Sequence, residues 1–325
     1  MTIGQVTIGQ VTIGRLIDDL IIGLLKIKQD ITMDKFEELF AQYTTAYTEE
    51  QVKADVEKIL AAHYDENNKR AVWERLLSMI ELTSLNGDDT EEKLAKMTAK
   101  VNDFTDEYPG LKNVATICAY PALVPTVKEL LTADGVGITS VAGGFPAAQT
   151  FIEIKVAEVA LAVAAGATDI DVVLSQGKFL SGDYQTCYDE IVEMKAAAGK
   201  TDFKVILEVG ALKTPENIAK ASLLSMAAGA GYIKSSTGKI ATAATPESTW
   251  IMCQMIKQWY EKTGEKVLFK PAGGVSTTED AVKHYTLVKE ILGEGWLDNH
   301  SMRIGASRLA NNLLSSIEGK EVKYF

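Results

Sequence analysis

The feature that most constrains this sequence is a repeated alternation of short apolar runs with longer amphipathic segments. Eight runs have the character of strands: SMIELTSL, NVATICAY, GITSVAGGF, DIDVVLS, FKVILEVG, GYIKSST, KVLFKPAGG and SMRIGAS. Helical periodicity fills most of the gaps between them, at 149–165, 183–198, 214–228, 244–262 and 276–292. A strand followed by a helix, repeated over roughly 240 residues, is the pattern of a (β/α)8 TIM barrel.

An open, doubly wound parallel sheet is the alternative α/β fold for such a pattern. That fold would more often carry a glycine-rich dinucleotide loop after its first strand, and the first strand-like run here is followed by no such loop. We therefore expect a TIM barrel over residues 78–316.

The sequence before the barrel divides into two parts. Residues 1–32 contain a direct repeat (TIGQV, TIGQV, TIGR) whose period of five fits neither a helix nor a common solenoid. We expect this extension to lie outside the fold; a β-forming or assembly segment is the alternative. Residues 33–77 have helical periodicity, with Thr48 as a candidate N-cap, and predict a helical prelude. Residues 317–325 are the expected C-terminal tail.

Composition narrows the choice of partners and compartment. The net charge of −11 argues against nucleic acid or an anionic membrane as the main partner, although a local positive site for a small anion is compatible with it. No apolar run reaches the ~18 residues of a membrane span. The three cysteines and three histidines are scattered, which favours a reducing, cytoplasmic compartment and does not predict a metal site. The helical faces would be compatible with a homodimer.

Two segments of similar sequence place a carboxylate and a lysine at equivalent positions. AAGATDID (164–171) aligns with AAGAGYIK (227–234); in each, a helix ends at a glycine and a strand follows. Asp171 and Lys234 then occupy the same step of the fourth and sixth strands. Because alternate strands of a TIM barrel fill the same interior layer, both side chains should point inward near the C-terminal mouth. Asp169 shares that face at greater depth, where we expect an ion pair.

A second lysine, Lys270, ends the seventh strand beside Lys234. A lone lysine at a strand end usually reaches water or pairs with a carboxylate. Two neighbouring ammonium groups, however, disfavour protonation of one of them, as does burial, and a neutral amine attacks carbonyls to form a Schiff base. Asp171 could neutralise these lysines or pass protons beside them. Lys204 and Glu208 share a face of the fifth strand, and we expect them to form an internal pair.

Glycines and hydroxyls end the last three strands, in SSTGK, PAGGV and GAS. Backbone N–H groups exposed by glycine form anion cradles, and the loops after strands seven and eight are the usual phosphate site of this barrel. Turn glycines alone would explain one such loop, but three adjacent loops favour phosphate. Arg308 could add positive charge there. Cys118, in a strand, is expected to serve core packing.

Residues 78–316 resemble the deoxyribose-phosphate aldolases, which are class I (Schiff-base) aldolases. The resemblance rests on LTSLNGDDTEEKL (82–94), TICAYP (116–121), DIDVV (169–173), YIKSSTGK (232–239), FKPAGGV (269–275) and RIGAS (303–307). It implies reversible cleavage of 2-deoxy-D-ribose 5-phosphate to D-glyceraldehyde 3-phosphate and acetaldehyde, without a metal or an organic cofactor. Two alternatives remain: another Schiff-base lyase acting on a phosphorylated sugar, and a non-catalytic sugar-phosphate-binding barrel.

The same resemblance assigns roles to individual residues. It implies Lys234 as the Schiff-base lysine, Lys270 as the lysine that perturbs it, Asp171 as the proton relay, and Lys239 as part of the proton network. The implied substrate-pocket and phosphate-binding positions are Thr83, Leu85 and Thr237, and Gly238, Gly273, Gly274, Gly305 and Ser307.

Several positions depart from the pattern of the family. Glu81 stands where aspartate is frequent, Ser276 where arginine is common, and Arg308 where a second serine is common. The changes at Ser276 and Arg308 are compatible with a transfer of positive charge from the loop after the seventh strand to the loop after the eighth. The family's C-terminal tyrosine would match Tyr324, which precedes Phe325 here.

Overall fold

The computed structural model describes residues 35–325, which fall into two units. The first, Met1–Thr44, contains a described helix over 35–41. The second unit, Thr45–Phe325, contains the barrel. The repeat-bearing extension predicted at 1–32 lies outside the described residues.

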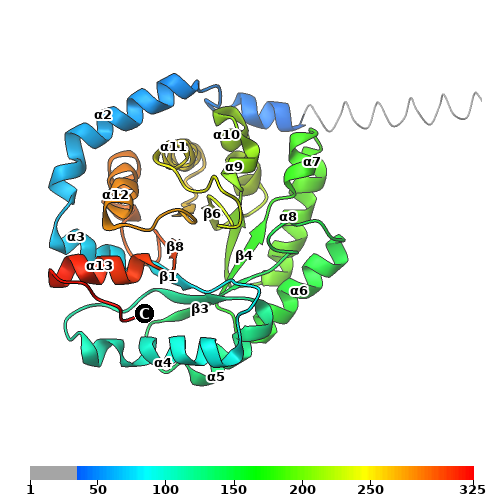
Figure 1. Cartoon of the computed structure of the whole chain (residues 1–325). Helices are drawn as coiled ribbons and strands as arrows, with labels where there is room; N and C mark the ends of the chain where they lie inside the picture. Colours follow the sequence, from blue (N-terminus) through cyan, green and yellow to red (C-terminus); the bar gives the residue numbers. More distant parts are fainter. Residues whose placement is uncertain (1–34) are drawn as a thin grey trace, which may run out of the picture. The chain divides into compact units, whose positions relative to one another are not determined.

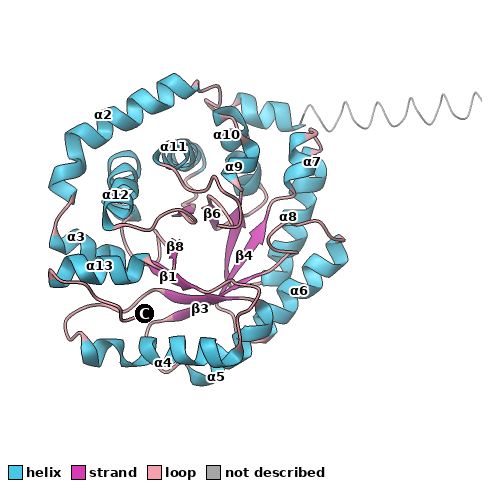
Figure 2. Ribbon diagram, in the orientation of Figure 1, coloured by secondary structure: helices cyan, strands magenta, loops and turns pink. Residues whose placement is uncertain are grey.

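Eight parallel strands form a single sheet in the order β7-β6-β5-β4-β3-β2-β1-β8. Bridges Phe269↔Met302 and Ala272↔Gly305 join β7 to β8 and close the sheet into the barrel seen in Figure 2. The TIM-barrel prediction is confirmed, and the open doubly wound alternative is wrong. The strands are β1 (Ile80–Thr83), β2 (Thr116–Ala119), β3 (Gly137–Val141), β4 (Asp169–Val173), β5 (Asp202–Ile206), β6 (Tyr232–Lys234), β7 (Leu268–Lys270) and β8 (Ile304–Ala306).

Helices surround the sheet as an outer ring (Figure 1). They are α4 (Glu91–Glu107), α5 (Val124–Leu130), α6 (Ile152–Ala164), α7 (Gln176–Leu180), α8 (Tyr184–Ala198), α9 (Val209–Leu212), α10 (Pro215–Ala227), α11 (Pro246–Thr263), α12 (Thr278–Leu292) and α13 (Leu309–Glu318), with 3₁₀ turns η1 (Pro121–Leu123) and η2 (Glu294–Trp296). No helix among residues 35–325 has the length and apolar character needed to cross a membrane.

Threonine hydroxyls fix where several of the ring helices begin. Thr90, Thr214, Thr245 and Thr277 each accept a hydrogen bond from a backbone N–H in the first turn of α4, α10, α11 and α12. Such N-caps satisfy donors that have no partner within the helix. They also fix the length of the loops that connect the mouth of the barrel to the ring.

The helical prelude includes α2 (Glu49–Asn67) and α3 (Arg70–Ser78), which precede β1. Thr48 caps α2, as the sequence predicted, and α2 packs against α11 and α12 with Val52 and Val56 buried. The guanidinium of Arg70 donates to the carbonyl of Ile317 at 2.6 Å, which ties α3 to α13. Both helices therefore belong to the packed body of the second unit, whereas residues 35–44 of the predicted prelude fall in the first unit.

The apolar core lies between the strands and the helical ring, while the interior of the barrel is charged. In β4, Ile170 and Val172 are fully buried on the ring side, and the alternating residues Asp169 and Asp171 take part in buried ion pairs with strand residues. A buried cluster of charges inside a barrel is costly, so its members must be paired. This cluster positions the site.

Candidate active site

Asp171 binds two lysines through one carboxylate oxygen. Lys234 Nζ lies 2.8 Å from Asp171 Oδ2, and Lys270 Nζ lies 2.7 Å from the same atom. Both side chains point into the barrel and meet there, but the prediction that they occupy the same step of their strands is wrong. Asp171 on β4 pairs with Lys204 on β5, whereas Lys234 on β6 pairs with Ile206 on β5. Lys234 therefore lies two residues closer to the carboxyl ends of the strands than Asp171 does. Its long side chain reaches back to the carboxylate.

A second layer of ion pairs supports this contact from below. Lys204 Nζ lies 2.6 Å from Asp169, 3.3 Å from Asp171 and 3.4 Å from Glu81. The ion pair predicted for Asp169 is confirmed. The internal pair predicted between Lys204 and Glu208 is wrong, because three interior carboxylates surround Lys204 and the backbone turns Glu208 away.

The charges of this cluster balance only when one basic group is neutral. Its ion pairs join three carboxylates to four basic groups: Glu81, Asp169 and Asp171, and Lys204, Lys234, Lys270 and Arg303. With Lys234 neutral, three cations face three carboxylates. An uncompensated buried charge is expensive, so the balance favours the amine form of this lysine.

The pKa values of the two neighbouring lysines move in opposite directions. Burial lowers the pKa of Lys234, and the charge of Lys270 lowers it further, while Asp171 opposes both. Burial alone would also lower the pKa of Lys270, but Asp171 and Glu81 outweigh it and raise that pKa. The direction for Lys234 is the one that the sequence predicted, but its larger cause is burial rather than crowding by Lys270.

Glu208 holds the loop that follows β6. Its backbone is left-handed (φ 59°, ψ 61°), which turns the buried carboxylate toward that loop. It accepts hydrogen bonds from the hydroxyl of Ser236 at 2.7 Å, from the hydroxyl of Thr237 at 2.5 Å and from the N–H of Thr237 at 3.2 Å. Strain of this kind persists only where the surroundings fix it, often at functional sites.

A cavity of about 530 Å³ opens above Lys234 at the carboxyl ends of the strands. Its lining includes each residue that the sequence assigned to the proton network, the substrate pocket or the phosphate site: Lys239, Thr83, Leu85, Thr237, Gly238, Gly273, Gly274, Gly305 and Ser307. The ammonium of Lys239 donates to the carbonyl of Leu85, which joins the β6 loop to the loop after β1. Asp171 and Lys270 lie fully buried and do not line the cavity.

Glycines let two of the candidate phosphate loops approach each other closely. Gly273 has a φ of +76°, and a Cβ added to it would lie 2.9 Å from Gly238 Cα and 2.8 Å from Ala243 Cβ. Both the backbone angle and the close approach therefore require glycine there. The resulting concave backbone, with Arg308 on its rim, is suited to an anion.

Several residues on the rim of the cavity were not predicted from the sequence. Lys93, which pairs with Asp89 at 2.5 Å, comes from α4, and Asn311 comes from α13. Asn311 Oδ1 accepts hydrogen bonds from the backbone N–H groups of Tyr324 and Phe325. Phe325 itself lines the cavity. The motifs carry no signal for these residues, because helix packing brings them to the mouth.

Tyr324, the match for the family's C-terminal tyrosine, lies outside the cavity lining. Its hydroxyl donates to the carbonyl of Lys100 at 2.7 Å, and its ring packs against Phe104 and Tyr108. Cys118 is fully buried, and burial raises the pKa of its thiol to about 11. That agrees with the predicted packing role of Cys118.

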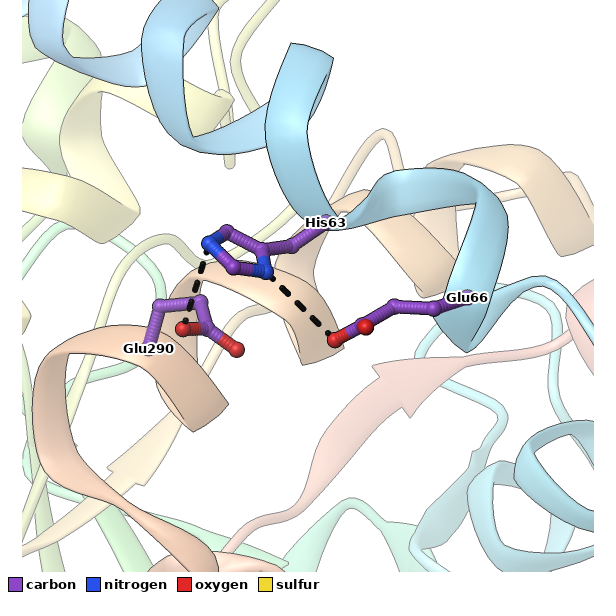
Figure 3. A group of neighbouring side chains, drawn as sticks. All are labelled: His63, Glu66 and Glu290. Atoms are coloured by element: carbon purple, nitrogen blue, oxygen red, sulfur yellow. Dashed lines mark ion pairs between the residues drawn. The ribbon is translucent and has the colours of Figure 1, made fainter.

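Two groups of side chains within residues 35–325 have donor atoms close enough for a metal ion. In the first, His63 directs one ring nitrogen to Glu66 (3.4 Å) and the other to Glu290 (3.6 Å), as Figure 3 shows. The two carboxylates therefore meet different nitrogens, and Lys289 lies 3.1 Å from Glu66. This arrangement is that of an ion-pair network between α2 and α12.

The second group comprises Glu81, Cys118 and Asp171. The ammonium of Lys270 contacts both of its carboxylates and so occupies the place of a cation. Both groups are thus accounted for by side chains of this chain.

An amine buried at the floor of a TIM-barrel mouth, beneath glycine-rich loops suited to an anion, is compatible with attack on the carbonyl group of a small anionic substrate. The comparison with known families is more specific. The sequence model of the DeoC/LacD family aldolases matches residues 75–295, and the chain belongs to this family.

Named relatives agree with that membership. A Caenorhabditis elegans protein provisionally named a deoxyribose-phosphate aldolase is 43% identical, covering 75% of this chain and 80% of its own. The human deoxyribose-phosphate aldolase is 37% identical, covering 79% and 84%. Among solved structures, the tetrameric deoxyribose phosphate aldolase of Aeropyrum pernix has a TM-score of 0.61 and 25% identity, covering 79% of this chain and 96% of its own.

Proposed function

We propose that this enzyme reversibly cleaves 2-deoxy-D-ribose 5-phosphate to D-glyceraldehyde 3-phosphate and acetaldehyde, with Lys234 as the Schiff-base lysine. The observation that carries the proposal is a buried lysine with a lowered pKa at the floor of the cavity, whose rim includes glycine-rich loops. The human and mouse relatives are named for this activity, and they are 37% and 40% identical to this chain.

The first step is attack of the neutral Lys234 amine on the aldehyde carbon, C1, of the open-chain sugar. Loss of water from the carbinolamine gives a protonated imine at C1, which accepts the electron pair of the C2–C3 bond when that bond breaks. The C3 hydroxyl then loses its proton, the C2–C3 bond breaks, and glyceraldehyde 3-phosphate leaves. The enamine that remains is protonated at C2 and hydrolysed to acetaldehyde and free lysine.

Asp171 and Lys270 relay the protons of these steps. Asp171 Oδ2 already accepts from both lysines, while its Oδ1 lies 3.3 Å from the ammonium of Lys204. A carboxylate beside the imine nitrogen can pass protons, directly or through water. Lys239, at the mouth, belongs to the same network in our proposal.

The phosphate binds at the backbone cradle formed by Gly238, Gly273, Gly274, Gly305 and Ser307. Arg308 supplies positive charge at the start of α13, in place of an arginine at Ser276. Thr83, Leu85 and Thr237 contact the sugar. Anchoring the phosphate orients C1 toward Lys234, which converts binding into an effectively intramolecular reaction.

Trapping tests the role of Lys234. Borohydride should reduce the imine formed with acetaldehyde, and peptide mass spectrometry should find the added ethyl group on Lys234 alone. The variant Lys234→Met should show no adduct and a loss of turnover of ~10⁴-fold or more. An adduct on Lys239 or on no lysine contradicts the assignment, and turnover of other phosphorylated aldehydes only would identify a different lyase.

We also propose that the enzyme works in the cytoplasm as a homo-oligomer, with a homodimer as its simplest form. All three cysteines are buried free thiols, which suits a reducing compartment. The Aeropyrum pernix relative is a tetramer.

A further inference from the structure

The carboxylate of Glu208 is buried between β5 and α9, and none of the proposed reaction steps uses it. Only 2% of this residue is exposed. Within residues 35–325, the hydrogen-bond donors that reach its carboxylate are neutral and belong to two residues of the loop after β6, Ser236 and Thr237. Burial of a carboxylate is costly unless its oxygens accept hydrogen bonds, so Glu208 and this loop hold each other in place.

The two oxygens of this carboxylate receive different donors. Oε1 accepts the hydroxyl of Ser236 at 2.7 Å and the backbone N–H of Thr237 at 3.2 Å, while Oε2 accepts the hydroxyl of Thr237 at 2.5 Å. A carboxylate only accepts hydrogen bonds, so the hydroxyl proton of Thr237 points at Glu208. The same hydroxyl oxygen accepts the backbone N–H of Lys239 at 3.0 Å. Since a hydroxyl oxygen has two lone pairs, Thr237 Oγ1 has one left to offer.

Thr237 carries this orientation to the catalytic cavity, which it lines with 6% of its surface exposed. We propose that Glu208 is a positioning residue, which makes Thr237 Oγ1 a hydrogen-bond acceptor for a hydroxyl group of the substrate. The inference rests on the proposed function, which supplies a phosphorylated sugar with hydroxyl groups. It adds the direction of the hydrogen bond and the residue that sets that direction.

The direction of this hydrogen bond selects among substrates. A sugar hydroxyl donates its proton to Thr237 Oγ1, whereas a carbonyl, ether or phosphate oxygen has no proton to give and meets a lone pair. A site built to bind a hydroxyl discriminates strongly against analogues that lack it. We therefore expect hydroxylated substrates to be favoured over their keto and deoxy counterparts at the carbon that faces Thr237.

Glu208→Gln reverses the hydrogen bond without changing the shape of the side chain. The backbone N–H of Thr237 can only donate, so the amide oxygen stays at the Oε1 position, which this N–H faces. The amide nitrogen then takes the Oε2 position and donates to Thr237 Oγ1. The threonine proton must turn away from residue 208 into the direction that the lone pair held, where it opposes the proton of the sugar hydroxyl.

Steady-state kinetics and trapping separate this effect from damage to the catalytic lysine. In Glu208→Gln, kcat/KM for 2-deoxy-D-ribose 5-phosphate should fall at least tenfold. The borohydride-trapped adduct of acetaldehyde on Lys234 should form at the same rate as in the unaltered chain, because acetaldehyde carries no hydroxyl group.

Glu190→Gln is the matched control. Glu190 is also a buried carboxylate and accepts the hydroxyl of Ser175 at 2.5 Å, but neither residue lines the catalytic cavity. The control should leave kcat/KM unchanged. Urea unfolding shows that both variants are folded and measures the stability that each one loses.

A double variant shows whether Glu208 acts through the hydroxyl of Thr237. Thr237→Val removes that hydroxyl, so adding Glu208→Gln to it should lower kcat/KM no further. An unchanged kcat/KM in Glu208→Gln, an equal fall in acetaldehyde trapping, or additive losses in the double variant would overturn the role of Glu208. A missing adduct on Lys234 in the unaltered chain is a different result: it would overturn the proposed function, and this inference with it.

Discussion

A single buried side chain, Lys270, adds to the effect of burial on the pKa of Lys234. Lys270 stays protonated because Asp171 and Glu81 hold its charge, and that charge helps to lower the pKa of Lys234. Because Lys270 also shares Asp171 Oδ2, it limits the stabilisation that Asp171 gives to a protonated Lys234. Lys270 thus favours the reactive amine in two ways.

The variant Lys270→Met should move the acid limb of the pH–rate profile to higher pH. Without Lys270, the pKa of Lys234 rises, so protonation removes the nucleophile at a pH where the unaltered enzyme is still active. We expect the rate at pH ~7 to fall roughly tenfold or more, since a charge-assisted hydrogen bond contributes about 1.5–3 kcal/mol.

The pH dependence of borohydride trapping measures this directly. Lys93→Met is the matched control, because Lys93 is a lysine on the rim that pairs with Asp89 and has no contact with Asp171 among the described ion pairs. The control should alter KM without moving the limb. An unchanged limb in Lys270→Met would mean that burial alone sets the pKa of Lys234.

The difference between Lys234 and Glu208 shows which residues a sequence can place. Lys234 and Asp171 follow from alternation along a strand and from glycines that end the preceding helices. Glu208 obeys the same alternation, yet a left-handed backbone angle redirects it to Ser236 and Thr237. A non-glycine residue in that conformation leaves no mark in a single sequence.

At the level of helices and loops, Gly273 in the loop after β7 sets how closely that loop approaches the loop after β6. Gly273→Ala introduces a Cβ at positive φ and within 3 Å of both Ala243 Cβ and Gly238 Cα. The loop must open to relieve this contact, so we expect a rise in KM of at least tenfold and a loss of about 2–4 kcal/mol in the free energy of unfolding.

Gly264→Ala is the matched control for this substitution. Gly264, at the C-cap of α11, has nearly the same φ (+74°), but an added Cβ there would meet nothing within 4 Å. It should cost only the ~1–2 kcal/mol of backbone strain and leave KM unchanged. Steady-state kinetics measure the effect on KM, and urea unfolding measures the effect on stability. Equal KM values for Gly273→Ala and Gly264→Ala would show that Gly273 does not contribute to phosphate binding.

The strand and helix order could be predicted from the sequence because periodicity is local. The rim of the cavity could not. Lys93, Asn311 and Phe325 reach it from α4, α13 and the tail, through contacts between segments far apart in the chain. Packing of that kind depends on the whole fold, and no single motif encodes it.

For the molecule as a whole, we expect removal of the helical prelude to cost more stability than removal of the repeat-bearing extension. The barrel and its candidate catalytic residues lie within Thr45–Phe325. There α2 buries Val52 and Val56 against its neighbours, and α3 binds the carbonyl of Ile317 through Arg70. The extension and the prelude should therefore differ in the effect of their removal.

Two truncations test this difference. A chain that starts at Met33 should keep its kcat/KM and its midpoint of urea unfolding. A chain that starts at Ser78 should lose several kcal/mol of stability, because burial of one valine side chain alone contributes about 1.5–3 kcal/mol and α2 buries two. Its α11 and α12 would expose apolar surface to water. Loss of activity or solubility in the chain from Met33 would show instead that the extension has a structural role.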